Sequence, residues 1–333
     1  MMLSNVDPLL KNAWHPVALA AEVSSTPHRI WLLGDPWVLV QSATDEMPRA
    51  YRDRCPHRLA PLSTGQLMDD GTLQCGYHGW RFAVDGLCTF VPALGDDAIL
   101  TQRARLEPAS AVAIVAGIVW IAPEHPLNVL PDTSRADVGF ERGMIQPVAT
   151  AGCAGAMIDN FLDVAHFPFV HRGTFATDES DRVDEYIVTR TGTGFVAVTE
   201  HTFANHEDPG VSSGERPLLQ RRRMSYDYTG PFTATLRLDY VEAGGTNLIV
   251  FAVQPESDGR CRLYTTIYRN DIAAEAMDAA IAFEERVLAE DLVIQHRMAA
   301  ALPLDLTMEV HTKADRVTIE LRRVLSEFLQ RPR

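Results

Sequence analysis

Short segments with alternating apolar and polar side chains fill the first third of the chain. Residues 29–33 and 37–41 alternate around a Gly-Asp-Pro turn, a pattern that predicts a β-hairpin. Glycine and proline then recur up to about residue 122, where an apolar run, 111–122, is rich in valine and isoleucine and predicts a buried strand. We therefore expect a small all-β domain with long loops.

The rest of the chain has longer periodic segments. A stretch with several prolines, residues 123–146, is predicted to be a linker, and we place a helix over 154–166. Six strands are expected near residues 184–191, 194–203, 220–228, 232–241, 246–253 and 260–268. Their length and regular spacing favour one large antiparallel sheet. Two helices, near 273–299 and 313–330, are expected to close the chain.

These elements predict an α+β protein with two domains. Residues 1–140 would form the all-β domain, and residues 141–333 a domain in which helices flank a large antiparallel sheet. The composition agrees with a globular protein of this size, since 46% of the 333 residues are hydrophobic and 22% are charged.

Charge and targeting signals exclude several classes of protein. A formal net charge of −14 argues against binding to nucleic acid or to anionic membranes. The first 20 residues lack the basic start and apolar core of a signal peptide, and the most apolar run, 12 residues, is too short to span a bilayer. Five widely spread cysteines indicate reduced thiols rather than disulfides. We therefore expect a cytoplasmic protein.

Two short motifs each pair one thiol with one imidazole. Cys55-Pro-His57 is followed, after 17 residues, by Cys75-Gly-Tyr-His78. Four such side chains can hold a tetrahedral zinc ion, although zinc fingers usually pair Cys with Cys and His with His within a loop. The mixed pairs favour a [2Fe–2S] cluster in which one iron takes both sulfurs and the other takes both imidazoles. The zinc site is the alternative.

The stretch from Asn160 to His171 contains a second group of possible ligands. Asp163 and His166 are three residues apart, so on a helix they would share one face. Pro168 disfavours helix beyond His166, so we expect the chain to turn there and bring His171 alongside. Two imidazoles and a carboxylate suit a metal ion. Two buried structural histidines with a capping aspartate are the alternative, and this stretch alone does not decide between them.

The two cysteine loops carry a family resemblance. Cys55-Pro-His-Arg-Leu-Ala-Pro-Leu-Ser63 and Cys75-Gly-Tyr-His-Gly-Trp-Arg-Phe82 resemble the cluster loops of Rieske non-haem iron oxygenase α subunits, in particular the vanillate demethylase and dicamba monooxygenase group. The similarity extends to Asn12-Ala-Trp-His-Pro-Val-Ala18, where the family usually has Tyr in place of His15, and through the 160–171 stretch. It covers both domains and implies a second domain of the helix-grip (START-like) type.

The resemblance implies two metal centres. One is a [2Fe–2S] cluster bound by Cys55, His57, Cys75 and His78, and the other is a mononuclear Fe(II) bound by His166, His171 and Asp291. Without the resemblance, Asp291 could not be distinguished from its neighbour Glu290. The family also places Asn160 near the iron, and it places Asp163 between His166 and the His78 of the next subunit in a homotrimer.

The resemblance also implies a reaction and its partners. Such an oxygenase uses O₂ and electrons from a ferredoxin and/or an NAD(P)H-dependent reductase to hydroxylate or demethylate a small aromatic substrate. No G-x-G-x-x-G motif follows a predicted strand, so the reductase is expected to be a separate protein. The alternatives are ring dihydroxylation, which related chains perform, and a Rieske electron carrier with a ligand-binding domain.

Two further groups of side chains have a possible role in binding. Five arginines form a basic cluster that would either dock an acidic ferredoxin or make local ion pairs: Arg49, Arg52, Arg54, Arg58 and Arg81. The substrate pocket is expected between the large sheet and the last helices, with five candidate lining residues: Arg237, Tyr240, Asn247, Phe251 and Phe283.

Overall fold

The computed structural model describes residues 1–95, 101–176, 181–205 and 208–331. The chain divides into two compact units, and each is described by itself. The N-terminal unit comprises residues 8–127 and 255–258, and the C-terminal unit comprises residues 1–7, 128–254 and 259–333. Within the described residues, no helix is long and apolar enough to cross a membrane.

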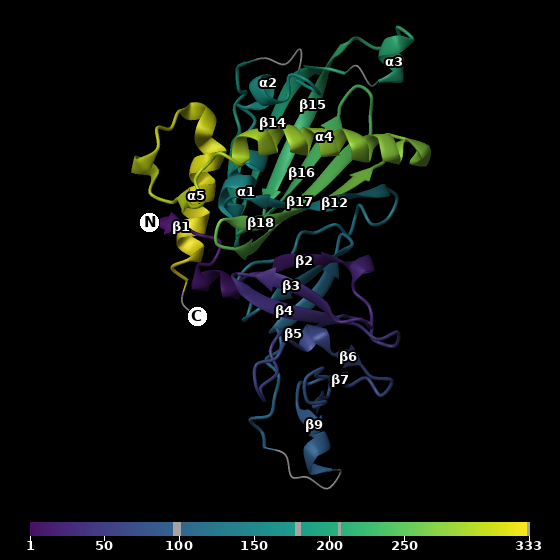
Figure 1. The fold of residues 1–333 in the computed structure, drawn as a ribbon. Helices are drawn as coiled ribbons and strands as arrows, with labels where there is room; N and C mark the ends of the chain where they lie inside the picture. Colours follow the sequence, from purple (N-terminus) through teal and green to yellow (C-terminus); the bar gives the residue numbers. More distant parts are fainter. Residues whose placement is uncertain (96–100, 177–180, 206–207, 332–333) are drawn as a thin grey trace. The chain divides into compact units, whose positions relative to one another are not determined.

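The N-terminal unit is built from small antiparallel sheets, in the strand orders β10-β11-β2, β3-β4-β5 and β6-β7-β8-β9 (Figure 1). Its strands are β2 (His15–Leu19), β3 (His28–Leu32), β4 (Asp35–Val40), β5 (Arg49–Arg52), β6 (Gln66–Leu67), β7 (Leu73–Gln74), β8 (Arg81–Phe82), β9 (Cys88–Phe90), β10 (Ala111–Val115) and β11 (Ile118–Ala122). Short 3₁₀ helices cover Pro8–Asn12, Ala20–Glu22, Leu62–Thr64 and Pro92–Leu94. The predicted hairpin at 29–41 is confirmed as β3 and β4, but its turn is Leu33-Gly34, because Asp35 and Pro36 already pair within β4.

The apolar run at 111–122 is two strands rather than the single strand predicted. Ala116 and Gly117 both have positive φ, 56° and 76°, and they turn the chain tightly between β10 and β11. Positive φ is uncommon for alanine, so the apolar sequence did not predict a turn that begins at Ala116.

The C-terminal unit is organised around a seven-stranded antiparallel sheet, in the order β12-β18-β17-β16-β15-β14-β13. Its strands are β12 (Glu141–Ala151), β13 (Ile187–Arg190), β14 (Phe195–Ala204), β15 (Leu219–Tyr228), β16 (Thr233–Tyr240), β17 (Thr246–Ser257) and β18 (Arg260–Arg269). A separate pair joins β1 (Met2–Leu3) to β19 (Leu302–Pro303). The predicted large antiparallel sheet with flanking helices is confirmed.

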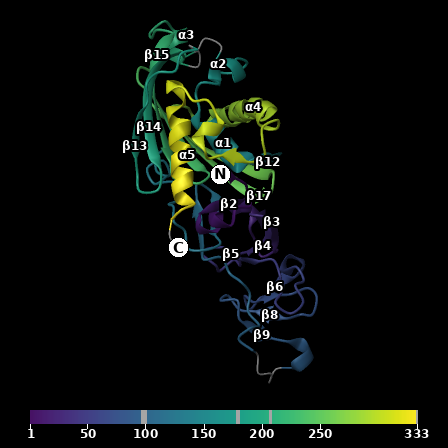
Figure 2. The same ribbon diagram turned by 90° about the vertical axis from the view of Figure 1, so that its left-hand side faces the viewer.

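Apart from the short helix α3, the helices of this unit lie on one face of the sheet (Figure 2). They are α1 (Ala154–Leu162), α2 (Phe167–Val170), α3 (Pro209–Ser212), α4 (Met277–Gln295) and α5 (Arg316–Phe328), with 3₁₀ turns at Ala274–Ala276, Leu306–Met308 and Lys313–Asp315. The long helix α4 runs across the strands (Figure 1), and α5 lies alongside α1 (Figure 2).

The strand register decides which side chains face these helices. Residues directly opposite one another in antiparallel strands share a face of the sheet. Two such rows across β15, β16 and β17 are Met224–Leu238–Asn247 and Tyr226–Leu236–Ile249. All six side chains line the cavity described below. This face therefore presents a mostly apolar floor.

Two predictions about element boundaries are wrong. Residues 141–146 are not linker but the start of β12, an edge strand whose register shifts between Ile145 and Val148. Pro147 lies within that irregularity and has no N–H to donate, which hid the strand pattern. The helix predicted over 154–166 ends at Leu162, because Asp163 takes an extended conformation with ψ of 137°.

The N-terminal unit also contains a buried histidine. His15 in β2 is fully buried, and its Nε2 lies 2.8 Å from the carbonyl oxygen of Leu10. Burial lowers the pKa of His15 from 6.5 to about 4, and the hydrogen bond to Leu10 offsets this only in part. Below pH 6.5 the unfolded chain therefore binds a proton that the folded chain excludes, so stability falls as the pH drops towards 4.

We predict that His15→Gln makes the protein less sensitive to mild acid. Glutamine can still donate a hydrogen bond to Leu10, but it does not titrate. Between pH 7.5 and 5.5 the unmodified protein should lose about 1 kcal/mol more stability than the variant. Thermal unfolding midpoints across this pH range measure the difference, with His125→Gln at an exposed site as the control. Equal pH slopes for the protein and both variants would contradict the prediction.

Candidate metal centres and pocket

The two cysteine loops of the N-terminal unit have the same construction. In the first, the N–H of Cys55 donates to the Ala60 carbonyl at 2.8 Å and the N–H of Leu59 donates to the Cys55 carbonyl at 2.8 Å. In the second, Cys75 bonds Trp80 at 2.8 Å and Gly79 bonds Cys75 at 3.0 Å in the same pattern. Leu59 and Gly79 occupy equivalent positions and both have positive φ, 58° and 69°. The two loops therefore share a backbone conformation, although His57 follows Cys55 by two residues and His78 follows Cys75 by three.

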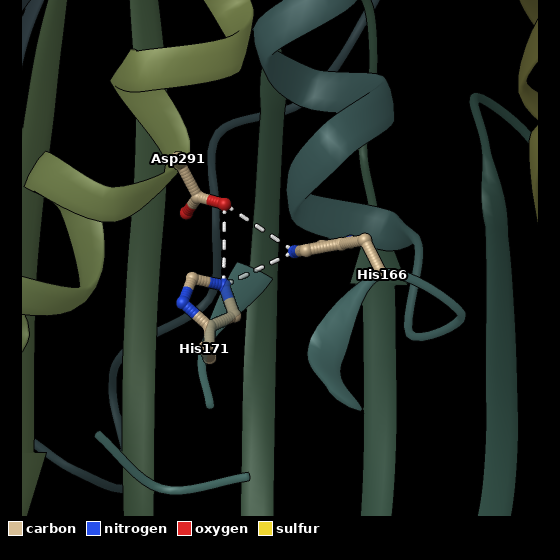
Figure 3. A group of neighbouring side chains, drawn as sticks. All are labelled: His166, His171 and Asp291. Carbon is tan, nitrogen blue, oxygen red and sulfur yellow. Dashed lines mark hydrogen bonds and ion pairs between the residues drawn. The ribbon is translucent and has the colours of Figure 1, made fainter. Parts of the chain in front are cut away.

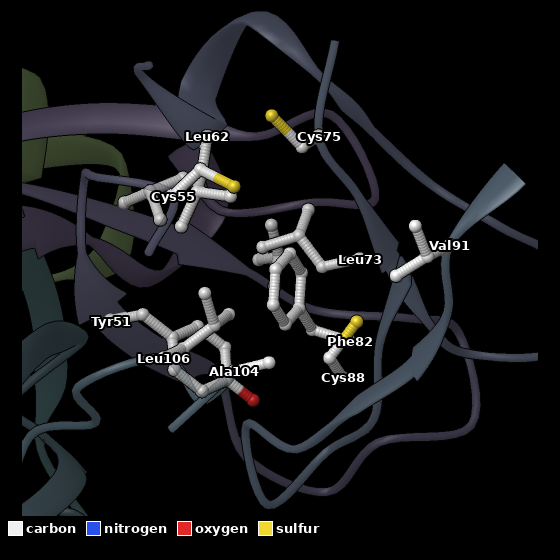
Figure 4. Close-up of a cluster of buried hydrophobic side chains, with 12 residues drawn as sticks. Tyr51, Cys55, Leu62, Leu73, Cys75, Phe82, Cys88, Val91, Ala104 and Leu106 are labelled. Atoms are coloured by element: carbon white, nitrogen blue, oxygen red, sulfur yellow. The ribbon is translucent and has the colours of Figure 1, made fainter. Parts of the chain in front are cut away.

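The thiols of these loops are buried and the imidazoles lie nearer the surface. Cys55 and Cys75 are almost fully buried, and both belong to the hydrophobic cluster drawn in Figure 4. The rings of His57 and His78 are 4.5 Å apart, and His57 stacks on Trp80 with ring centroids 4.5 Å apart. Burial, together with the neighbouring Cys75, raises the pKa of the Cys55 thiol. A cationic centre bound there would favour the thiolate form.

These four side chains fit a two-iron cluster better than one zinc ion. A tetrahedral ion needs all of its ligand atoms around one point. Within the part of the chain that the structure describes, the one group of three or more such ligands with all donor atoms within 4.8 Å lies elsewhere and includes none of the four. Gly76 lets the Thr64 backbone lie directly against the second loop, since a Cβ there would lie 2.5 Å from the Thr64 carbonyl oxygen.

Cys88 lies at the other end of the same cluster. Figure 4 shows its sulfur beside Phe82 and Val91, away from the sulfurs of Cys55 and Cys75. The Cys88 thiol is 3.5 Å from the carbonyl oxygen of Phe90. It is a packed thiol.

The second group of ligands converges in the C-terminal unit. His166 Nε2 lies 3.1 Å from His171 Nε2, and Asp291 Oδ1 lies 3.3 Å from the first and 3.2 Å from the second (Figure 3). His166 lies between α1 and α2, His171 directly follows α2, and Asp291 comes from α4. Asp163 and His166 are not on one helical face, but the helix break still leaves Asp163 Oδ2 3.1 Å from His166 Nδ1.

The spacing of the three donor atoms matches a metal ion. Ligand atoms held about 2.1 Å from a divalent cation at right angles to one another lie about 3 Å apart. The three observed separations, 3.1, 3.2 and 3.3 Å, agree with this value. Two histidines and one carboxylate on one face form the facial triad of non-haem Fe(II) sites. Asp291 Oδ1 is buried and faces the Nε2 atoms of both imidazoles, which also suits a metal ligand.

The charges of the site shift the pKa values of His166 and Asp291 in opposite directions. Burial lowers the pKa of His166, but hydrogen bonds and charges from Asp163 and Asp291 outweigh it and raise that pKa to about 9. Burial raises the pKa of Asp291, but the two imidazoles outweigh it and lower that pKa to about 2. A bound cation would take the place of the proton on His166.

Each of the three ligands is held by a second polar side chain. Asp163 accepts from His166 Nδ1, and Glu290 accepts from His171 Nδ1 at 2.9 Å. The third, Asp291, has its pKa lowered in part by a hydrogen bond with Asn160, whose Oδ1 accepts from Gln295 Nε2 at 2.8 Å. Asn160 is therefore close to the triad. The contacts of Glu290 with His171 and of Gln295 with Asn160 were not predicted, because single carboxylates and amides on an amphipathic helix form no distinguishing sequence pattern.

A cavity of about 310 Å³ opens onto the triad. Its walls are largely aromatic and aliphatic, from Phe161, Phe167, Phe175, Phe203, Met224, Tyr226, Leu236, Leu238, Ile249 and Val287. Three of the five predicted lining residues, Tyr240, Asn247 and Phe283, line it. Phe251 lies behind the wall, stacked on Phe161 with ring centroids 4.6 Å apart.

The prediction for Arg237 is wrong. Arg237 pairs with Leu248 across the strands, on the face opposite to the Leu238–Asn247 row, and its guanidinium binds Asp239 at 2.9 Å. Another arginine, Arg222, does line the cavity, and it was not predicted from the sequence. It is buried in the cavity wall, with its guanidinium 4.5 Å from the centre of the Phe203 ring.

Comparison with known families agrees with both centres. Residues 13–106 match the Rieske [2Fe-2S] domain, and residues 151–331 match the vanillate O-demethylase oxygenase C-terminal domain. The second match covers more than half of the chain. The chain belongs to the Rieske oxygenase α subunits.

Relatives of this Rieske oxygenase align over different lengths. Methylxanthine N1-demethylase NdmA of Pseudomonas putida is 28% identical over 329 residues, 96% of this chain and 89% of the relative. Dicamba O-demethylase of Stenotrophomonas maltophilia is 31% identical over 195 residues, 55% of this chain and 54% of the relative. Chlorophyllide a oxygenase of Chlamydomonas reinhardtii is 34% identical over 172 residues, which is 50% of this chain but only 25% of that protein.

Solved structures share the fold. An NdmA mutant with theobromine superposes with a TM-score of 0.82 at 24% identity, covering 97% of this chain and 91% of that one. Dicamba monooxygenase bound to 3,6-dichlorosalicylic acid gives a TM-score of 0.80 at 20% identity, covering 96% and 98%.

Most arginines of the basic cluster of this Rieske oxygenase contact local partners, and three of them form close ion pairs. Four of its five arginines contact a neighbouring acidic or amide side chain: Arg49 with Asp45 (2.9 Å), Arg52 with Asp35 (2.5 Å), Arg54 with Glu107 (2.7 Å) and Arg81 with Gln74 (3.0 Å). These contacts favour local structural pairs over a docking surface.

We predict that His57→Ala abolishes the cluster but not the second site. Acid-labile sulfide and the visible absorption of the cluster should disappear, because one iron loses an imidazole. The metal-free variant should still bind one Fe(II), since the triad belongs to the other unit. Cys88→Ala is the control and should keep the cluster. Stoichiometric zinc without labile sulfide in the unmodified protein would contradict the assignment.

Proposed function

We propose that this chain is the terminal component of a monooxygenase that hydroxylates a small aromatic substrate or removes a methyl group from its oxygen or nitrogen. The observation that supports this most is the opening of the His166–His171–Asp291 triad onto an apolar cavity with aromatic walls. A facial triad leaves positions for O₂ and substrate on the side away from the protein ligands.

The residues of the two sites have separate tasks in this proposal. Cys55, His57, Cys75 and His78 hold the cluster, and His166, His171 and Asp291 hold the Fe(II). When bound, the iron would activate O₂ with electrons that the cluster delivers one at a time. The apolar walls, among them Phe161 and Leu238, bind the ring and exclude water from the reaction.

The side chain of Asn247 supports a polar contact to the substrate. Its Oδ1 is buried and has no hydrogen-bond partner among the described residues, although Asn247 lines the cavity. An unpaired buried acceptor costs about 1–3 kcal/mol. A substrate N–H or O–H group would offset that cost and fix the orientation of the ring.

Demethylation would use both oxygen atoms of O₂. One oxygen atom of O₂ enters a methyl C–H bond, and the other leaves as water after taking up two electrons and two protons. The hydroxymethyl product, a hemiacetal on oxygen or a hemiaminal on nitrogen, then releases formaldehyde. The similarity to NdmA and dicamba O-demethylase, both named as demethylases, favours this outcome over ring dihydroxylation.

The electrons would come from a ferredoxin and/or an NAD(P)H-dependent reductase, and the subunits would form a homotrimer. Cluster and iron ligands belong to different compact units, and a head-to-tail ring brings the cluster of one subunit to the iron of the next. Asp163 would bridge them. It already binds His166 and the N–H of Ala165, and its side chain is 31% exposed, which leaves acceptor capacity for His78 of the neighbouring subunit.

We predict that methoxy- and N-methyl aromatic compounds are turned over with about one formaldehyde per O₂ consumed. The assay supplies a ferredoxin and reductase and follows formaldehyde, O₂ and product mass. A cis-dihydrodiol product would instead support ring dihydroxylation. Reduction of the cluster without oxygen incorporation into any substrate would support an electron carrier and contradict the proposal.

We predict that Asp291→Ala keeps the cluster but loses the mononuclear iron. The iron content should fall from about three to about two per chain, and oxygenation should disappear, because the facial triad is incomplete. Iron analysis, the cluster spectrum and O₂ consumption measure this. Retention of the third iron and of activity in Asp291→Ala would rule out Asp291 as a ligand.

We predict that two inactive variants restore activity when their subunits exchange. Cys55→Ala lacks the cluster and His166→Ala lacks the iron, yet a mixed trimer contains interfaces where an intact cluster faces an intact iron. Part of the activity should return on mixing. Exchange shown by mass spectrometry without any recovery would mean that electrons travel within one chain, and the bridging role of Asp163 would be wrong.

A further inference from the structure

Glu290 contacts the side of His171 that faces away from the triad. Figure 3 shows that one ring nitrogen of His171 points to His166 and Asp291, while the other points away from them. That second nitrogen, Nδ1, lies 2.9 Å from Glu290 Oε2. We propose that Glu290 is a positioning residue that fixes the tautomer and the ring orientation of His171. This inference rests on the proposed iron site.

The carboxylate of Glu290 is itself held in place. Its Oε2 also accepts from Thr174 Oγ1 at 2.9 Å, so one oxygen receives two donors. On the other side, a Cβ at Gly173 would lie 3.1 Å from Glu290 Oε1, so the glycine lets the chain pass close to the carboxylate. Phe175 stacks on the His171 ring with centroids 4.9 Å apart. The ring is therefore fixed both at its edge and on its face.

The tautomer matters because a neutral imidazole has one protonated nitrogen. If that proton were on Nε2, His171 would donate to Asp291 and could not bind a metal. A carboxylate at Nδ1 keeps the proton there and leaves the Nε2 lone pair free for the metal. His166 has the same arrangement, with Asp163 at its Nδ1. Both imidazoles are therefore oriented by a carboxylate.

Two consecutive carboxylates of α4 contact different atoms of the site. Neighbouring residues on a helix point about 100° apart, so Glu290 and Asp291 cannot face the same point. Asp291 lies next to the Nε2 atoms of both histidines, whereas Glu290 contacts His171 at Nδ1. The geometry assigns Asp291 to the metal and Glu290 to the ring that binds it.

The experiment measures Fe(II) binding to the mononuclear site of the full protein with its cluster intact. We expect Glu290→Ala to weaken this binding by about 10–100-fold, the usual effect of losing a group that orients a metal-bound histidine. The electron paramagnetic resonance spectrum of the Fe(II)–nitric oxide adduct should change its rhombicity, because the ring is free to rotate. Glu290→Gln, whose amide oxygen still accepts from Nδ1, should lie closer to the unmodified protein.

The controls separate positioning from other roles. Glu285→Ala removes an exposed carboxylate from the same helix and should bind Fe(II) like the unmodified protein. Thr174→Val removes the donor that holds Glu290 and should weaken binding by a smaller factor in the same direction. If Glu290→Ala does not fold, Thr174→Val and Glu290→Gln still test whether Glu290 positions His171.

Three results would overturn the inference. The first is Fe(II) affinity and adduct spectra in Glu290→Ala equal to those of Glu285→Ala. The second is a loss of binding as complete as in His166→Ala, which would make Glu290 a ligand. The third is equal weakening by Glu290→Ala and Glu290→Gln with no change in the adduct spectrum. Failure of the unmodified protein to bind a third iron would contradict the proposed function instead.

Discussion

Three electron-pair donors that face one another at about 3 Å are the constraint on which the C-terminal unit depends. His166 Nε2, His171 Nε2 and Asp291 Oδ1 meet at separations of 3.1–3.3 Å. Lone pairs at this distance repel unless a proton or a cation lies among them. The early end of α1, the short helix α2 and the course of α4 across the sheet each bring one donor to that point. The surrounding hydrogen bonds then keep the donors from turning away.

Those hydrogen bonds form one connected arrangement around the triad. Asp163 and Glu290 hold the two imidazoles, and Asn160, itself fixed by Gln295, holds the carboxylate. An imidazole that bound the metal without such support would retain its rotational freedom and its choice of tautomer. The extended conformation of Asp163 is part of this arrangement, since a helix continued to residue 166 would not place its carboxylate against both His166 and the N–H of Ala165.

The sequence predicts the ligands better than the local structure that carries them. Short spacings revealed both cysteine loops and the two histidines, because metal sites impose residue type as well as separation. Asp291 lies more than a hundred residues from His171, and no periodicity connects them, so only the family resemblance singled it out. The contact of Glu290 with His171 was not predicted for the same reason. The edge strand β12 was missed because Pro147 interrupts its alternation, and the turn at Ala116 because alanine rarely takes positive φ.

The strand register determines which side chains form the floor of the cavity. Arg237 and Asn247 were predicted together as lining residues, but they cannot both face the cavity. Asn247 is opposite Leu238, and directly opposite residues share a face, whereas Arg237 is one step along β16 and points to the other side. A shift of one residue would exchange Leu236 and Leu238 for charged side chains and leave the apolar residues in water. The apolar pairing across β15, β16 and β17 thus fixes the register, and the register in turn makes the cavity suitable for an aromatic ring.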